Sequence, residues 1–153
     1  MDNINIEQIF LDYNEYIYKY IYGMVQNRAE AEDLLQDTFI KVIKAQNTDV
    51  KNWKNYLLTI ARNTVYDHWR KKKNKISLDF LKLKERKKDI ELRLDIEKGI
   101  RKLSPKLKEV LVLREINQLE YKEIAEILGI EKGTVKSRLN RAREELKNFL
   151  EGK

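Results

Sequence analysis

Two groups of polar side chains in this 153-residue sequence have the types and spacing that functional sites use. One group is acidic: Glu30, Asp33 and Asp37 recur at steps of three and four residues, so a helix would place them on one side. Such carboxylates can hold a metal ion, act as an acid–base pair or form a charged surface for a partner. The other group is basic and lies near residue 140, where Lys, Arg and Asn side chains at helical spacing suit contact with DNA bases.

The acidic group allows an enzymatic interpretation and a binding one. As an enzyme, the chain would be a metal-dependent nucleic-acid enzyme that uses Glu30, Asp33 and Asp37. Metal sites in helical bundles draw ligands from several helices, and neither a histidine nor a second carboxylate-rich helix completes this group. Gln36 joins the three carboxylates at helical spacing. We therefore expect these four side chains to form an outward-facing patch for a partner, and we predict no catalytic residue, metal or cofactor.

The basic group lies within residues 121–150, which predict a helix-turn-helix. Gly129 supplies the permissive backbone that a sharp exit from the first helix needs. Along the second helix an apolar stripe recurs at steps of four and three, formed by Val135, Leu139, Ala142 and Leu146. The opposite face carries Lys136, Ser137, Asn140 and Arg141. The competing interpretation is an ordinary helical hairpin with a solvated basic face, but the turn glycine, the small Ala125 in the first helix and the basic face occur together.

Composition and periodicity predict that helices position both groups. The sequence has one proline and five glycines, which is too few turn-forming residues for a many-stranded sheet, so we predict an all-α fold. Residues 6–25 form a first amphipathic helix, and a second helix runs from a capping side chain at Asn27 to about residue 45. The apolar side of the second helix is expected to contain Ala31, Leu35, Phe39 and Val42.

A third helix, beginning near residue 52, mixes aromatic and basic residues on one side. These residues are Arg62, Tyr66, Trp69 and Lys73. Such a mixture suits unpaired bases, which stack on aromatic rings while cations hold the phosphates. Alternatively, Val65 and Trp69 widen the apolar face and are buried; for Trp69 burial is the favoured interpretation, because large aromatics at helical spacing usually belong to the core.

The second half of the chain predicts a four-helix module that ends in the helix-turn-helix. A helical pattern over residues 94–103 stops before Ser104 and Pro105, a cap residue followed by a first-turn proline. The charge-rich segment before it interrupts the pattern. We therefore predict two small helical domains, over residues 1–75 and 94–153, joined by a linker over residues 76–93.

Charge and cysteine content narrow the class of partner and the compartment. The formal net charge is +7 and the sequence pI is near 9.4, which favours a polyanionic partner such as nucleic acid. The sequence has no cysteine, so disulfides and thiolate metal sites are excluded, and an intracellular compartment is favoured. No apolar run is long enough to span a membrane and no signal-peptide pattern is present, so we predict a cytoplasmic protein without membrane insertion.

Three sequence segments together resemble a known family. They are A-E-D-L-L-Q-D-T-F at residues 31–39, I-A-R-N at residues 60–63 and G-T-V-K-S-R-L-N-R-A-R at residues 133–143. In this order and spacing they resemble an extracytoplasmic-function sigma factor of bacterial RNA polymerase, and the resemblance covers nearly the whole chain. It implies a non-enzymatic protein that binds core RNA polymerase and directs it to promoters. It also implies an anti-sigma protein that covers the polymerase-binding surfaces.

The resemblance implies roles for particular positions. The acidic face of the second helix would dock on the clamp of the largest polymerase subunit through Glu32, Asp33, Gln36, Asp37 and Phe39. The third helix and the segment before it would engage the melted minus-ten element through Asn47, Trp53, Arg62, Asn63, Tyr66, Asp67, Arg70 and Lys71. The last helix would enter the major groove of the minus-thirty-five element through Lys132, Thr134, Lys136, Ser137, Arg138, Asn140, Arg141 and Arg143.

Two points stay open at this stage. Glu120 stands where the family often has Ser or Thr as the cap of the first recognition-motif helix, so that cap is expected to be weaker. The alternative function is a conventional helix-turn-helix transcriptional regulator that acts without being a polymerase subunit. The two functions differ in whether promoter-specific activity requires core RNA polymerase.

Overall fold

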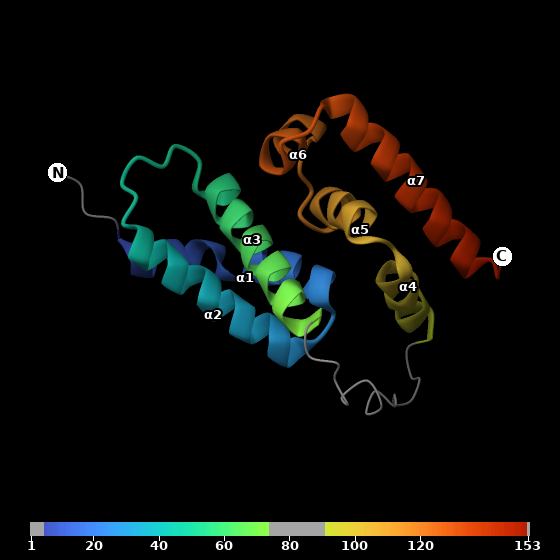
Figure 1. The fold of residues 1–153 in the computed structure, drawn as a ribbon, viewed down its shortest axis with the longest axis horizontal. Helices are drawn as coiled ribbons and strands as arrows, with labels where there is room; N and C mark the ends of the chain where they lie inside the picture. Colours follow the sequence, from blue (N-terminus) through green and yellow to red (C-terminus); the bar gives the residue numbers. More distant parts are fainter. Residues whose placement is uncertain (1–4, 74–90, 153) are drawn as a thin grey trace.

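The computed structural model describes residues 5–73 and 91–152. Every regular element in these residues is helical, which confirms the all-α prediction (Figure 1). In chain order the elements are α1 (Ile6–Val25), α2 (Arg28–Ala45), α3 (Trp53–Lys73), α4 (Glu91–Lys102), α5 (Pro105–Leu111), the π-helical segment η2 (Val112–Ile116), α6 (Tyr121–Leu128) and α7 (Lys132–Leu150).

The first three helices pack into one bundle around apolar side chains from all three. The predicted cap of α2 is confirmed, since the Asn27 side chain accepts a hydrogen bond from the Glu30 amide at 2.9 Å. The predicted apolar side of α2 is partly wrong: Leu34 and Thr38 are buried, whereas Leu35 is only half-buried. Thr38 can be buried because its hydroxyl donates to the Leu34 carbonyl at 2.8 Å.

The second bundle, α4 to α7, has the predicted helical content. Ser104 caps α5, accepting from the Leu107 amide at 3.4 Å, and Pro105 occupies the first turn, as the sequence predicts. The predicted linker lies mostly outside the described residues, and its last three positions, 91–93, belong to α4. Among the described helices, none is long and apolar enough to cross a membrane.

The π-helical segment η2 is a feature that the sequence does not predict. The Asn117 amide donates to the Val112 carbonyl at 3.0 Å, which closes the wider turn. This turn directs the buried Asn117 toward α1, where its side-chain amide donates to the Tyr16 carbonyl at 3.2 Å. The Tyr16 hydroxyl donates in return to the Asn117 carbonyl at 2.9 Å. The π turn therefore links the two bundles.

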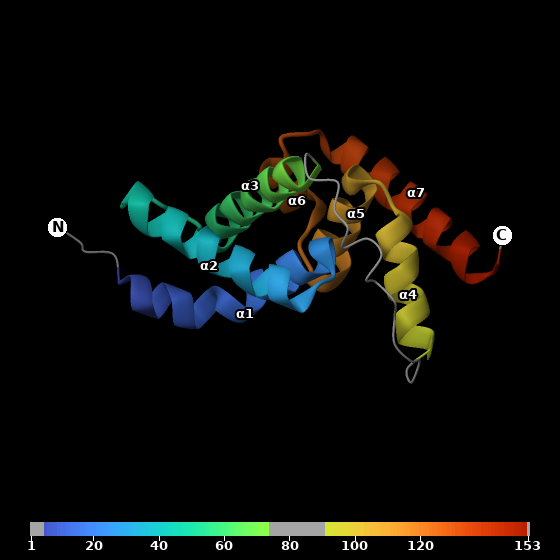
Figure 2. The same cartoon turned by 60° about the horizontal axis from the view of Figure 1, so that its bottom comes forward.

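The two bundles lie against each other. Helix α3 contacts α6, and α1 contacts η2 and α5; Figures 1 and 2 show α3 beside the start of the helix-turn-helix from two directions. Gly23 of α1 allows the close approach, since a Cβ there would lie 3.0 Å from Val112 Cγ1. The contact decides which side chains are available on α3.

Candidate nucleic-acid and polymerase interfaces

The helix-turn-helix forms as predicted. Gly129 adopts the left-handed conformation with φ of 68°, which ends α6 and turns the chain into α7. The apolar stripe of α7 faces inward, with Val135, Leu139 and Ala142 buried. Its opposite side is exposed, and we call its four side chains the recognition face: Lys136, Ser137, Asn140 and Arg141. Donors and acceptors of these types, on a helix backed by a second helix, suit the major groove.

The remaining positions predicted on α7 differ in their availability. Lys132 is exposed at the start of the helix, and Thr134 is half-buried. Arg143 is exposed but donates to the Glu115 carboxylate at 2.6 Å, and this hydrogen bond raises the pKa of the guanidinium. Arg138 is half-buried and lines the surface between α7 and the start of α5. The structure thus leaves the recognition face and Lys132 exposed, whereas Arg138 and Arg143 lie against other parts of the protein.

A basic pocket beside the recognition face contains residues that the sequence analysis missed. Its volume is about 610 Å³, and Lys102 and Lys106 line it together with Ser137, Arg138 and Arg141. The two lysines come from either side of the Ser104–Pro105 junction, where α4 ends and α5 begins. The signal in the sequence is a lysine on each side of a predicted helix start. Cations here extend the positive surface of α7 beyond the helix itself.

The expected weakness of the α6 cap is compensated. Glu120 lacks the hydroxyl of Ser or Thr, but the Glu123 carboxylate accepts a hydrogen bond from the Glu120 amide at 3.2 Å. Glu123 also pairs with Lys54 of α3 at 3.4 Å. The same carboxylate therefore caps the helix-turn-helix and joins it to the first bundle.

On α3, two of the predicted minus-ten residues are engaged by the second bundle. Glu109 of α5 is only 1% exposed, and its carboxylate accepts from Arg62 Nε at 2.8 Å and from the Tyr66 hydroxyl at 2.8 Å. Burial by itself lowers the pKa of the Arg62 guanidinium, but the hydrogen bond and charge of Glu109 raise it overall. Burial, with the same charge, raises the pKa of the Tyr66 phenol well above its ordinary value. Both groups thus stay in their hydrogen-bonding protonation states.

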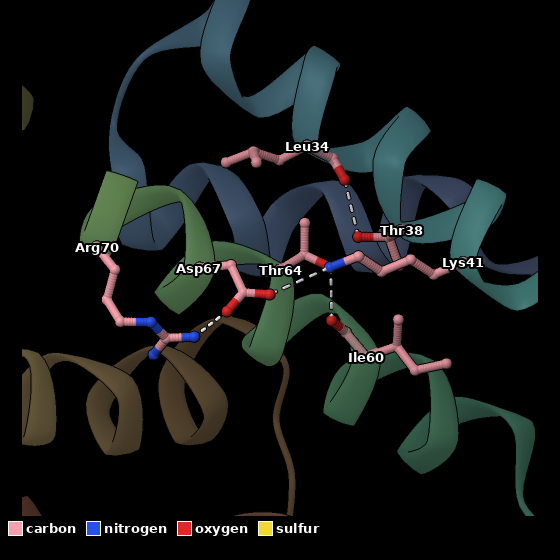
Figure 3. Close-up of polar contacts among 7 residues, drawn as sticks. All are labelled: Leu34, Thr38, Lys41, Ile60, Thr64, Asp67 and Arg70. Atoms are coloured by element: carbon pink, nitrogen blue, oxygen red, sulfur yellow. Dashed lines mark hydrogen bonds and ion pairs between the residues drawn. The ribbon is translucent and has the colours of Figure 1, made fainter. Parts of the chain in front are cut away.

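The other predicted minus-ten side chains of α3 are more accessible. Asn63, Arg70 and Lys71 are exposed. Asp67 accepts from Arg70 and pairs with Lys41 of α2 at 3.5 Å, while Lys41 also donates to Thr64 at 3.0 Å (Figure 3). This network fixes α3 against α2, so Asp67 has a structural role in this conformation.

The segment before α3 presents its predicted residues in different ways. Asn47 is exposed, and its side-chain oxygen accepts from the Asp49 amide at 3.0 Å, which shapes the loop. Trp53 is half-buried, with its ring edge-on to Tyr56 at a centroid distance of 5.4 Å. Trp69, for which burial was favoured, is half-buried, and the Lys108 ammonium lies 5.6 Å from the centre of its ring. Its neighbours therefore include the second bundle as well as the first.

The predicted polymerase face of α2 is largely exposed. Glu32, Asp33, Gln36 and Asp37 are all accessible. Phe39, in contrast, is 5% exposed, belongs to the apolar core and packs edge-on against Phe10 at 5.0 Å, and its contact with the polymerase stays a prediction. The sequence analysis missed two apolar side chains on α2, Ile40 at 47% and Ile43 at 50% exposure. Exposed isoleucines beside a charged patch are typical of a protein-binding surface.

Glu30 does not belong to the outward acidic patch, which corrects that prediction. Its carboxylate accepts from Lys72 at 2.9 Å and lies 3.3 Å from the His68 ring, both on α3. The reason is that the first turn of α2 faces the end of α3, where basic residues gather. Within the described residues no group of three or more His, Cys, Asp or Glu side chains is placed to hold a metal ion.

Comparison with known proteins agrees with this geometry. Residues 9–75 match the family described as sigma-70 region 2, and residues 93–146 match sigma-70, region 4. The ECF RNA polymerase sigma factor SigW of Bacillus subtilis is 34% identical over 158 residues, covering 90% of this chain and 84% of that protein. RNA polymerase sigma factor SigZ of the same organism is 32% identical over 156 residues, covering 97% of this chain and 89% of that protein.

Solved structures show the same arrangement of helices. The sigma factor RpoE in complex with the anti-sigma factor NepR from Bartonella quintana superposes with a TM-score of 0.75 at 26% identity, covering 95% of this chain and 96% of that chain. CnrH in complex with the cytosolic domain of CnrY also gives a TM-score of 0.75, at 21% identity, and supports the fold alone. With both sigma regions matched in order and two relatives above 30% identity, the chain belongs to the extracytoplasmic-function group of the sigma-70 family.

Proposed function

We propose that this protein is a sigma factor that binds core RNA polymerase and directs promoter-specific initiation by recognising minus-ten and minus-thirty-five elements. The observation that carries the proposal is the presence on one chain of an exposed recognition face on α7 and an exposed acidic, apolar-edged face on α2. The first suits duplex DNA and the second suits a protein partner. The chain supplies binding surfaces and makes no covalent bond itself.

The polymerase-binding surface is centred on the exposed side of α2. Asp33, Gln36 and Asp37 provide charge and hydrogen bonds, with Glu32 at the edge. Ile40 and Ile43 add apolar area on the same helix, and apolar area supplies most of the free energy in protein association. Phe39 supports this surface from the buried side of α2, where it packs on Phe10 and holds the helix in place.

The minus-thirty-five element is recognised in the major groove by α7. Asn140 suits adenine and Arg141 or Lys136 suits guanine, because each side chain matches the donor and acceptor pattern of that base edge. Lys132, Thr134, Arg138 and Arg143 flank the face and contact phosphates, which orient the helix without specifying sequence. Lys102 and Lys106 extend the phosphate-binding surface from the pocket beside α7.

The minus-ten element is recognised by α3 and the segment before it. Asn47, Trp53, Asn63 and Asp67 surround a base extruded from the stack, whose unstacking must be offset by the pocket that receives it. Arg62, Arg70 and Lys71 hold the phosphates of the same strand, and Tyr66 stacks or donates beside them. The protein acts in the cytoplasm, with RNA polymerase, and an anti-sigma protein regulates it by covering the polymerase-binding surfaces.

Run-off transcription tests the proposal. A preferred promoter is first selected from a random library with purified core RNA polymerase and this protein, and transcripts are then measured with core alone, with the protein alone and with both. We expect a defined transcript only when both are present. A conventional regulator would instead bind the duplex specifically without core and give no core-dependent transcript from any selected sequence, which would overturn the proposal.

A further inference from the structure

Two pockets of this protein adjoin each other around α5. The first is the basic pocket beside the recognition face, with a volume of about 610 Å³. The second, which we call the inter-bundle pocket, has a volume of about 540 Å³ and is lined by residues of α3 and of the second bundle. Figures 1 and 2 show α5 between α3 and α7, and the pockets share the side chains of Ser104, Lys106 and Arg138. Each volume suits a small ligand.

The basic pocket has an excess of positive charge. The four cationic side chains that line it are Lys102, Lys106, Arg138 and Arg141. Its lining also includes one carboxylate, that of Glu145, which pairs with Arg141 at 3.4 Å. Arg138 is half-buried and forms no ion pair with any residue that the structure describes. A guanidinium in this position is well matched by phosphate oxygens, and the number of cations suits more than one phosphate group.

The inter-bundle pocket differs because part of its wall is apolar. This part is formed by Pro105, Leu128, Ile130 and the ring of Tyr66. Arg62 and Glu109 also line the pocket, but they are bonded to each other at 2.8 Å, so their charges compensate. A sugar–phosphate backbone has no apolar group for such a wall, whereas a heterocyclic base has a flat face that packs on apolar and aromatic side chains.

We propose that the adjoining pockets bind a nucleoside diphosphate, with its phosphates in the basic pocket and its base in the inter-bundle pocket. Lys106 and Arg138 line both pockets, so they lie where the two parts of the ligand meet and hold the phosphates. Lys102 supplies a further cation beyond them. The apolar wall contacts the base. The site itself does not depend on the proposed function.

Nucleotide binding has a consequence for DNA binding. Ser137 and Arg141 line the basic pocket and also belong to the recognition face. A nucleotide in the pocket occupies donors that a base edge in the major groove would use. The nucleotide and the minus-thirty-five duplex should therefore weaken each other's binding by the same factor. This consequence, unlike the site, rests on the proposed function.

Calorimetric titration of the full chain tests the site directly. The probes are ADP, GDP, inorganic pyrophosphate and adenosine, all at one ionic strength because salt screens the attraction of exposed cations for any polyanion. We expect saturable binding of ADP or GDP, at least about fivefold tighter than that of pyrophosphate or adenosine, since contact with the base contributes at least this factor. Pyrophosphate binding as tight as that of both nucleotides, or no saturable nucleotide binding, would overturn the proposal.

Two variants locate the nucleotide on the protein. Arg138→Ala and Lys106→Ala should each weaken nucleotide binding by at least about tenfold, because each removes a charge-assisted hydrogen bond to phosphate. Lys106 is exposed, so its variant keeps the test valid if Arg138→Ala is unstable in thermal unfolding. Lys132→Ala is the matched control, since Lys132 is an exposed cation of α7 that is not among the residues lining either pocket. An equal loss in the control would assign the binding to general positive charge and overturn the site.

Competition with DNA gives a second readout. Saturating nucleotide should weaken binding of the selected minus-thirty-five duplex to the full chain by at least about fivefold in fluorescence anisotropy. The same nucleotide concentration should have no effect on Arg138→Ala. Nucleotide binding without competition would place the ligand away from the recognition face and overturn the assignment to these pockets. If core RNA polymerase and the protein give no transcript from any selected sequence, the proposed function fails, whereas calorimetry still decides the nucleotide site.

Discussion

Two faces of this protein carry similar residue types but have different surroundings. On α7, the recognition face (Lys136, Ser137, Asn140 and Arg141) is open to solvent, and Arg141 has only an exposed pair with Glu145 at 3.4 Å. On α3, Arg62 and Tyr66 are bound to the buried Glu109. A basic face that is identified by its composition can therefore be either exposed or bound to another part of the protein. Its state depends on a residue far away in the chain.

The largest effect should come from the acidic face of α2, which belongs to neither of the two DNA-binding faces. Reversing charge in Asp33→Lys/Asp37→Lys should weaken binding to core RNA polymerase by on the order of 3 kcal/mol, because like charges at an interface are strongly unfavourable. Duplex minus-thirty-five binding by the full chain should be retained. Binding to core can be measured by fluorescence anisotropy, with Asp12→Lys/Glu15→Lys on α1 as a charge-matched control. Unchanged affinity would remove α2 from the polymerase interface.

DNA binding by the recognition face of α7 should weaken when a single side chain is removed. Arg141→Ala should cost about 1–3 kcal/mol in binding the selected minus-thirty-five duplex if the guanidinium contacts a base edge with two hydrogen bonds. The loss should be concentrated at one base position when single-base variants of the duplex are compared. Equal weakening on all sequences would assign Arg141 to phosphate instead. Glu144→Ala, exposed on the same helix, is the control for surface change.

Two ion pairs, Arg62–Glu109 and Arg141–Glu145, allow a buried and an exposed pair to be compared within the same protein. A double-mutant cycle with Arg62→Ala and Glu109→Gln should give a coupling energy of about 1–2 kcal/mol in thermal unfolding, because both partners lose water where the two bundles pack together. The same cycle with Arg141→Ala and Glu145→Gln should give only about 0.3–0.5 kcal/mol, since those side chains are 74% and 45% exposed. Similar couplings in the two cycles would show that the two bundles are not packed together at this ion pair in solution.

The last prediction concerns a single hydrogen bond between the bundles. Tyr16→Phe removes the hydroxyl that donates to the Asn117 carbonyl at 2.9 Å and should cost about 1 kcal/mol of stability. Burial, with the charge of Glu123, raises the pKa of Tyr16 to about 12, so the phenol remains a donor at neutral pH. The shift in Tm checks the prediction, and Tyr18→Phe is the control on the same helix. A loss no larger than that of the control would mean that this bond does not stabilise the packing of the two bundles.

Much of the fold could be predicted because its signals are local. The bounds of α1, the cap at Asn27, the Ser104–Pro105 helix start and the turn at Gly129 each depend on residues within one or two helical turns. The recognition face was predicted for the same reason: a stripe of Val135, Leu139 and Ala142 dictates which side of α7 remains outside. The π turn of η2 has no such local signal. It places Asn117 so that its side-chain amide donates to Tyr16 of α1, a residue far away in the sequence.

The sequence by itself determined the helices other than η2, most of their inward and outward faces and the family to which the chain belongs, since each depends on short-range periodicity and on motif residues at fixed spacing. Only the tertiary structure decided which outward residues are free. Arg62 and Glu109 are 47 positions apart, and Glu30 meets Lys72 across 42. Such partners are chosen by how helices pack, because burial and charge compensation operate between neighbours in space and leave no periodic pattern along the chain.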